Sequence, residues 1–233
     1  MALPQLVLVP GLLNDAELWR DQIAGLAGIV RPVVADITRG STLEALAAAV
    51  LAVGESRFAL AGFSLGGIVA QEVMRLAPER VTHLALLGTT MLPDGPSRMA
   101  ERRHLLSLAG HPGKFHGFGQ RLVHAYLAPE HHGDSAMIAR VRGMAERLGP
   151  EVFIRQSLIE RPDSRATLAG IACPTMVLCG EHDAITPPSL HRDMAGLLRN
   201  ASLVVVPASG HLVPIEQPGA VNAALGKLLR SRP

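Results

Sequence analysis

The order of apolar segments along the chain predicts an α/β protein in which about six mostly parallel strands form one sheet with helices on both faces. Short, continuously apolar segments alternate with segments that show helical periodicity. Strands whose side chains are nearly all apolar, with no alternation of polar and apolar residues, are typical of a parallel sheet that is buried on both faces. The 233 residues fit one domain, and the 48% of hydrophobic residues can build its core.

Six segments are predicted to be strands, because each is short, apolar and rich in Val, Leu or Ala. They are residues 6–9, 31–36, 57–62, 81–87, 175–179 and 202–206. Helical patterns occupy the sequence between most of these strands, within about residues 14–26, 42–53, 66–76, 189–198 and 219–229. Ser41 and Thr42 are candidates for the N-cap of the second helix.

Residues 91–171 interrupt this alternation. They contain helical patterns, frequent Gly and Pro, and six of the ten histidines, but no convincing strand. The segment does not read as a linker, because its large apolar side chains need a surface to pack on, namely Phe115, Phe118, Tyr126, Met137, Met144 and Phe153. We therefore predict a core made of residues 1–90 and 172–233, and a helical cap made of residues 91–171.

The composition argues against several classes of protein. The formal charge of +2 comes from 22 basic and 20 acidic side chains without a long basic run, so a nucleic acid is not an expected partner. No apolar run reaches the roughly 20 residues of a membrane helix, and the first residues do not resemble a signal peptide. Cys173 and Cys179 lie too far apart on one extended run for a disulfide, and free thiols suit a reducing compartment. We expect a cytoplasmic protein, while its oligomeric state stays open.

Ser64 is the candidate nucleophile. It is the central residue of the pattern Gly-Phe-Ser-Leu-Gly, which stands between a predicted strand and a predicted helix. Glycine on both sides permits the sharp turn that would expose such a serine. The pattern alone is weak, because Gly and Ser are common in loops, but its place between strand and helix strengthens it.

Asp183 and His211 are the expected partners of Ser64. A serine hydroxyl needs a nearby base, and that base needs a group that orients it. Asp183 and His211 each follow a predicted strand, and the carboxyl ends of parallel strands meet at one edge of the sheet. A polar loop residue is unremarkable by itself, but all three residues stand at strand ends in the order Ser, Asp, His.

These features together resemble the α/β-hydrolase superfamily, in its compact bacterial esterase-like branch. The segment from Gly210 to Pro218 is similar to the family's Gly-His-x4-Glu-x-Pro pattern, and the segment from Pro10 to Trp19 is similar to its His-Gly loop followed by Trp. Pro10 replaces the histidine of that loop. The family's cap is inserted where residues 91–171 stand.

The resemblance implies the rest of the site. The backbone N–H groups of Leu12 and Leu65 would form an oxyanion hole, and Trp19 and Phe63 are tentative pocket residues. No cofactor or metal is expected. The implied activity is hydrolysis of a small-molecule carboxylic ester, or a related acyl substrate, through an acyl-enzyme, with Ser64 as nucleophile, His211 as base and Asp183 orienting it.

Other interpretations remain. The same triad could serve a lactonase, a C–C bond hydrolase or a perhydrolase of the haloperoxidase type, and the fold could also serve as a ligand-binding protein with little turnover. Asp94 is an alternative acid, since some relatives of this fold carry the acid after the fourth strand. The histidines of residues 91–171 match no compact metal motif. Glu181 and His182 are expected to be solvated, and Glu216 to fix the loop behind His211.

Overall fold

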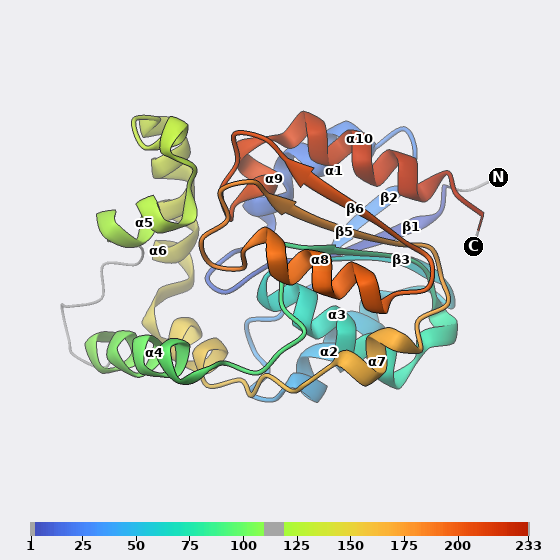
Figure 1. Cartoon of the computed structure of the whole chain (residues 1–233), viewed down its shortest axis with the longest axis horizontal. Coiled ribbons are helices and arrows are strands. Elements are labelled where there is room, and N and C mark those ends of the chain that lie inside the picture. The colour runs from blue at the N-terminus through green and yellow to red at the C-terminus, as the bar shows by residue number, and fades with distance from the viewer. Residues whose placement is uncertain (1–2, 110–118, 233) are drawn as a thin grey trace.

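The computed structural model of the chain describes residues 3–109 and 119–232. Six parallel strands form one sheet in the order β2-β1-β3-β4-β5-β6 (Figure 1). The strands are β1 (Gln5–Val9), β2 (Arg31–Val34), β3 (Phe58–Phe63), β4 (Val81–Leu87), β5 (Thr175–Gly180) and β6 (Ala201–Val206). The predicted α/β class, strand number and parallel direction are therefore confirmed.

The strand ends differ from the predicted ones by one or two residues. The largest difference is in β2, which was expected to continue to Asp36 but ends at Val34. The Asp36 carboxylate accepts hydrogen bonds from the N–H group and the hydroxyl of Thr38, at 2.9 and 2.6 Å. This local side-chain turn competes with the strand and ends it.

Helices cover both faces of the sheet (Figure 1). One face packs on α1 (Arg20–Leu26), α9 (Val213–Glu216) and α10 (Pro218–Leu229), and the other on α2 (Leu43–Val53), α3 (Leu65–Leu76), α7 (Arg165–Ala169) and α8 (Pro188–Leu197). Thr42 caps α2, because its hydroxyl accepts a hydrogen bond from the N–H of Ala45 at 3.2 Å. Each face has its own apolar core, and the two cores share the sheet.

The helix expected within residues 14–26 has two parts. A 3-10 turn, η1 (Ala16–Trp19), precedes α1, and Asp15 caps this turn by accepting a hydrogen bond from the N–H of Glu17 at 2.9 Å. A second 3-10 turn, η2 (Pro78–Arg80), leads from α3 into β4.

Between β4 and β5 the described residues form helices and no strand. They are α4 (Pro96–Ala109), α5 (Gln120–Tyr126), the 3-10 turn η3 (Pro129–His131) and α6 (Ser135–Ser157), followed by α7. Helices α4, α5 and α6 lie beyond the ends toward which the arrows of β5 and β6 point (Figure 1). Helix α6 is broken at Gly149, which has a φ angle of 74° and precedes Pro150. Helix α7, near the end of the segment 91–171, packs against α3 and α8 of the α/β layers.

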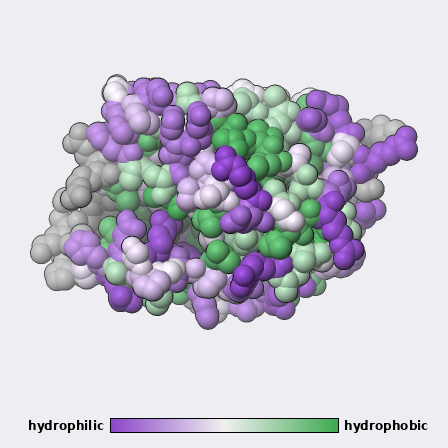
Figure 2. Space-filling model, viewed as in Figure 1, coloured by the Kyte–Doolittle hydropathy of each residue, from purple (hydrophilic) through white to green (hydrophobic). Residues whose placement is uncertain are grey.

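The edge strand β6 is more exposed than the inner strands. Apolar residues gather over β6 between α8 and α10 on the face seen in Figure 2. The side chains of Met144 and Phe153 are buried, whereas Phe115 and Phe118 lie outside the described residues. Cys173 and Cys179 are both free thiols. Within residues 3–109 and 119–232, no helix combines the length and the apolar character that crossing a membrane requires.

Candidate active site

Ser64 stands on a strained turn between β3 and α3. Its φ angle is 52°, in the left-handed region that residues other than glycine rarely adopt. Its N–H donates to the carbonyl of Leu87 on β4 at 2.9 Å. A Cβ atom on Gly62 would lie 2.2 Å from the carbonyl oxygen of Gly66, and one on Gly66 would lie 2.2 Å from that of Val9. The two glycines of the motif are therefore needed for close packing of backbone against backbone.

Two residues that the sequence analysis did not identify support this turn. The hydroxyl of Thr89 donates to the carbonyl of Ser64 at 2.7 Å. The N–H of Thr89 donates in turn to Nε2 of His191, at 3.1 Å, and His191 is fully buried on α8. Thr89 lies two residues after the end of β4 and no motif marks it, and His191 lies within an ordinary helical pattern.

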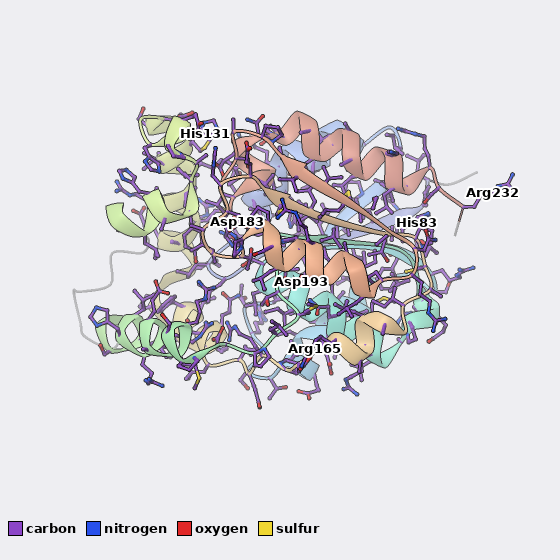
Figure 3. The ribbon with its side chains drawn as sticks, viewed as in Figure 1. His83, His131, Arg165, Asp183, Asp193 and Arg232 are labelled. Atoms are coloured by element: carbon purple, nitrogen blue, oxygen red, sulfur yellow. The ribbon has the colours of Figure 1, made fainter. Side chains whose placement is uncertain are left out.

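The structure brings Ser64, Asp183 and His211 together. Nε2 of His211 lies 3.1 Å from Oγ of Ser64, and its Nδ1 lies 3.0 and 2.9 Å from the two carboxylate oxygens of Asp183. Figure 3 shows Asp183 on the loop after β5, toward the side of the molecule where α4, α5 and α6 lie. Asp183 and His211 are almost completely buried, whereas Ser64 is partly exposed.

Asp183 is held as a carboxylate. Its oxygens accept hydrogen bonds from the N–H groups of Ile185 and Thr186 at 2.9 and 2.8 Å, and from the Thr186 hydroxyl at 2.8 Å. Burial by itself would raise the pKa of Asp183, but the His211 imidazole and these hydrogen bonds outweigh it and hold that pKa below its usual range. An ionised Asp183 can hold a proton on Nδ1 of His211, which leaves Nε2 free to accept one from Ser64.

The loop that carries His211 is fixed from two sides. The Glu216 carboxylate accepts hydrogen bonds from the N–H of Gly210, at 3.0 Å to each oxygen, and from the N–H of Ala128 at 2.7 Å. The N–H of His211 donates to the carbonyl of Tyr126 at 2.8 Å. The segment after α5 is therefore bonded directly to the loop of the candidate base.

Leu12, Ser64 and Leu65 border one small cavity. Leu65 is the first residue of α3, so its N–H lies at the positive end of the helix dipole. In the described part of the chain, neither the Leu12 nor the Leu65 N–H donates to a protein acceptor. The neighbouring N–H, on Leu13, donates to Oε1 of Gln156 on α6 at 2.9 Å, and this hydrogen bond holds the loop after β1. Gln156 was not identified from the sequence.

The two tentative pocket residues lie in the apolar core instead of on this cavity. Trp19 is 0% exposed, because the turn η1 points its ring into the core between the sheet and the helices of that face. Phe63 is 1% exposed, and its ring packs against the His211 imidazole with 5.0 Å between the ring centroids. Tyr126 packs on the same imidazole edge-on, at 5.1 Å between centroids.

The other candidates have different surroundings. Asp94 forms an ion pair with Arg102, whose Nε donates to it at 2.8 Å, so its carboxylate orients no histidine in the described residues. Glu181 and His182 are exposed on the loop that carries Asp183. The imidazoles of His124 and His132 stack on one another at 4.3 Å between centroids, while His111 and His116 lie outside the described residues. Among the described residues, no three His, Cys, Asp or Glu side chains are grouped so that they could hold a metal ion.

A parallel sheet with a serine on a tight strand–helix turn defines the class of protein, and sequence comparison gives the same class. Residues 6–224 match the model of the alpha/beta hydrolase family. The chain belongs to the alpha/beta hydrolase family.

The relatives include compact bacterial esterases. A pimeloyl-(acyl-carrier protein) methyl ester esterase of Pectobacterium carotovorum is 30% identical over 240 residues, which cover 92% of this chain and 90% of that protein. The structure of a thermophilic esterase from Thermogutta terrifontis, bound to malate, is similar with a TM-score of 0.86 and 30% identity over 98% of this chain and 90% of that one. The enol-lactonase from Burkholderia xenovorans shares the fold, with a TM-score of 0.87 and 21% identity over 99% and 93% of the two chains.

Proposed function

We propose that this chain is a serine hydrolase that cleaves a carboxylic ester of a small molecule through an acyl-enzyme intermediate. The observation that carries the proposal is the continuous chain of contacts from Ser64 Oγ through the His211 imidazole to the Asp183 carboxylate. The two relatives with 30% identity that are esterases support an ester as the substrate class.

In the proposed mechanism, Ser64 Oγ attacks the ester carbonyl carbon while Nε2 of His211 takes the hydroxyl proton. The carbonyl oxygen becomes an oxyanion facing the N–H groups of Leu12 and Leu65, each of which would contribute about 3–4 kcal/mol to stabilising the transition state. The C–O bond to the alcohol then breaks, and His211 returns the proton to the leaving oxygen. A water molecule repeats the cycle on the acyl-enzyme and releases the carboxylic acid. No step requires a cofactor.

The substitution Ser64→Ala tests this mechanism. It removes the attacking oxygen, so turnover of p-nitrophenyl acetate is expected to fall by roughly 10⁴-fold or more. Covalent labelling by a fluorophosphonate is expected in the wild type and not in the variant. The exposed residue Ser202 on β6 provides the control, and Ser202→Ala should keep both the ester turnover and the fluorophosphonate labelling of the wild type. Wild-type turnover in Ser64→Ala would contradict the mechanism.

The alternatives are separated by substrate. A lactonase, a C–C bond hydrolase or a perhydrolase would use the same three residues but would turn over a lactone, a diketone or a peroxide faster than any simple ester. A ligand-binding protein would be labelled by the fluorophosphonate and would turn over none of them. Rates measured on these substrates beside p-nitrophenyl esters of increasing acyl length distinguish these four alternatives from the proposed esterase.

A further inference from the structure

Three arginine side chains border the cavity next to Ser64. Arg98 and Arg102 are four residues apart on α4 and so share one face of that helix, and Arg161 follows α6. All three side chains line the same cavity, of about 70 Å³, as Ser64. The proposed catalysis uses none of them.

The positive charges exceed the negative ones around this cavity. Asp94 is the one carboxylate among its described lining residues, and both Arg102 and Arg161 face the same oxygen of Asp94. The contact with Arg102 is close, with Nε at 2.8 Å, whereas Nε of Arg161 lies 3.9 Å away. Arg98 has no ion pair within the described part of the chain. An adjoining cavity adds one more carboxylate, Glu101, which still leaves the arginines in excess.

Arg161 is the most buried of the three, with 8% of its side chain exposed. Its guanidinium donates to the backbone carbonyls of Ile159 and Gln156. Burial, reinforced by the positive charge of Arg102, lowers the pKa of Arg161 to about 10. A cation held away from water beside another cation is costly unless an anion compensates it. Asp94 is shared between two guanidinium groups and compensates only part of this charge.

A hydroxyl group without a partner lies close by. Ser157, at the end of α6, is 2% exposed, and its Oγ has no hydrogen-bond partner among the described residues. Ser157 lines the adjoining cavity, which shares Leu12, Arg98, Arg102 and Tyr126 with the cavity of Ser64. A buried hydroxyl that lacks a partner is unfavourable, and a polar group of a bound substrate would satisfy it.

We infer that the substrate carries a carboxylate close to the ester that Ser64 attacks, and that Arg161, Arg102 and Arg98 bind this carboxylate. The inference rests on the proposed esterase function and names its substrate class, the monoester of a short dicarboxylic acid. The distance between the two groups is short, because Ser64 and Arg161 border one small cavity. Guanidinium groups suit a planar carboxylate, which they bind through two parallel hydrogen bonds.

Hydrolysis of a matched pair of substrates tests this site in the full-length protein. Monomethyl glutarate carries the carboxylate, and its neutral isostere has a carboxamide in the same place. We expect the wild type to have a kcat/KM roughly 10- to 100-fold higher for the anionic ester, the effect typical of a charged hydrogen bond. Arg161→Gln and Arg98→Gln should each remove most of this preference, so kcat/KM should fall much more for the anionic ester than for the neutral one.

The control variant is Arg39→Gln. The Arg39 side chain is 91% exposed and does not line the cavity, so this variant removes one positive charge elsewhere and should keep the wild-type preference. Arg98 is partly exposed, so Arg98→Gln gives a result even if the buried Arg161 cannot be replaced without unfolding. Equal rates on the two esters in the wild type, or equal losses on both esters in Arg98→Gln, would overturn the inference.

Binding separates this inference from the proposed function. Ser64→Ala cannot form an acyl-enzyme, so calorimetric binding of monomethyl glutarate to it does not depend on turnover. Binding that is lost in the double variant Ser64→Ala/Arg98→Gln, with the neutral isostere bound weakly by both, supports the carboxylate site. Equal binding of the two esters to Ser64→Ala overturns it, and tighter binding of inorganic phosphate than of glutarate overturns the choice of a carboxylate.

Discussion

At the scale of single residues, the buried side chain of His191 supports Thr89, which in turn binds the residue proposed as the nucleophile. Its Nε2 accepts the Thr89 N–H, and its Nδ1 lies 3.2 Å from the carbonyl of Pro187. This arrangement requires a neutral ring with the proton on Nδ1. Burial accordingly lowers the pKa of His191 below 6.5. Thr89 also binds the Ser64 carbonyl, so the neutral form of His191 supports the turn that presents Ser64.

The charge state of His191 makes stability depend on pH. Its pKa is lower in the folded state, so the unfolded chain binds more protons as the pH falls below about 6.5. The stabilisation is complete above that pH and is lost as the pH falls toward the folded-state pKa, by at most about 1.4 kcal/mol per pH unit. We expect His191→Gln, which can still accept from Thr89 and donate to Pro187, to flatten the pH dependence of the free energy of unfolding.

Urea unfolding of the wild type and of His191→Gln at pH 5 and pH 7.5 measures this difference. The other nine histidines are the same in both proteins, so their contributions cancel in the comparison. An exposed histidine provides a second control, and His104→Gln should keep the wild-type pH dependence. Parallel pH profiles for the wild type and His191→Gln would show that His191 is not the group responsible.

At the scale of elements, α3 can lie close to the end of β1 because Gly66, near the start of α3, has no side chain. A Cβ on Gly66 would lie 2.2 and 2.4 Å from the carbonyl oxygens of Val9 and Pro10, which are backbone atoms that cannot turn away. We expect Gly66→Ala to destabilise the fold by about 1–3 kcal/mol or more. It should also lower kcat, because moving the start of α3 displaces Ser64 and the N–H of Leu65.

Gly196 gives the matched control. It lies in α8, and a Cβ there would meet nothing within 4 Å. Gly196→Ala should therefore leave activity unchanged and raise stability by up to about 1 kcal/mol, because alanine is the better helix former. Thermal unfolding and ester turnover of both variants are the measurements. If the two substitutions have equal effects, the close approach at Gly66 does not matter.

The elements were predictable from the sequence because each strand is mostly apolar and is followed within a few residues by Gly, Pro or a polar residue. The segment predicted as residues 81–87 matches β4, and the other strands differ only at their ends. Ser64, Asp183 and His211 could be placed near one another because each follows a strand, and parallel strands end at one edge. The direction of the strands alone fixes this edge, whatever the packing of the side chains.

The remaining parts of the site could not be predicted, for a physical reason. Arg102 and Arg161 line the cavity, and Gln156 binds the loop after β1, because of the way α4 and α6 lie beyond the strand ends, and no periodicity in the sequence determines that position. The burial of Trp19 follows from the 3-10 turn η1, which has no distinctive sequence pattern. Thr89 and His191 act through hydrogen bonds whose distances only the fold sets.

At the scale of the whole molecule, the helices between β4 and β5 are bonded to the core on two sides. On one side, Arg140 of α6 forms an ion pair with Asp21 of α1 at 2.6 Å, and Gln156 binds the N–H of Leu13. On the other side, the buried carboxylate of Glu216 joins Ala128 to Gly210. Since the His211 loop is bonded directly to the segment after α5, the position of these helices and the position of the candidate base depend on each other.

Glu216→Gln tests this dependence. Oε2 of Glu216 accepts from the N–H groups of both Ala128 and Gly210, and Oε1 accepts from Gly210 as well, so a glutamine that keeps its oxygen at the Oε2 position would set its NH₂ group against the Gly210 N–H, donor against donor. We expect a loss of about 1–3 kcal/mol in the free energy of unfolding. Amide hydrogen exchange should become faster at Ala128 and Gly210, and at His211, whose N–H donates to Tyr126. Glu79 provides the control. It is exposed and lies far from this contact in the sequence, and Glu79→Gln removes the same charge. Faster exchange at Ala128 alone, with His211 protected and kcat unchanged, would mean that the helices can loosen without moving the base.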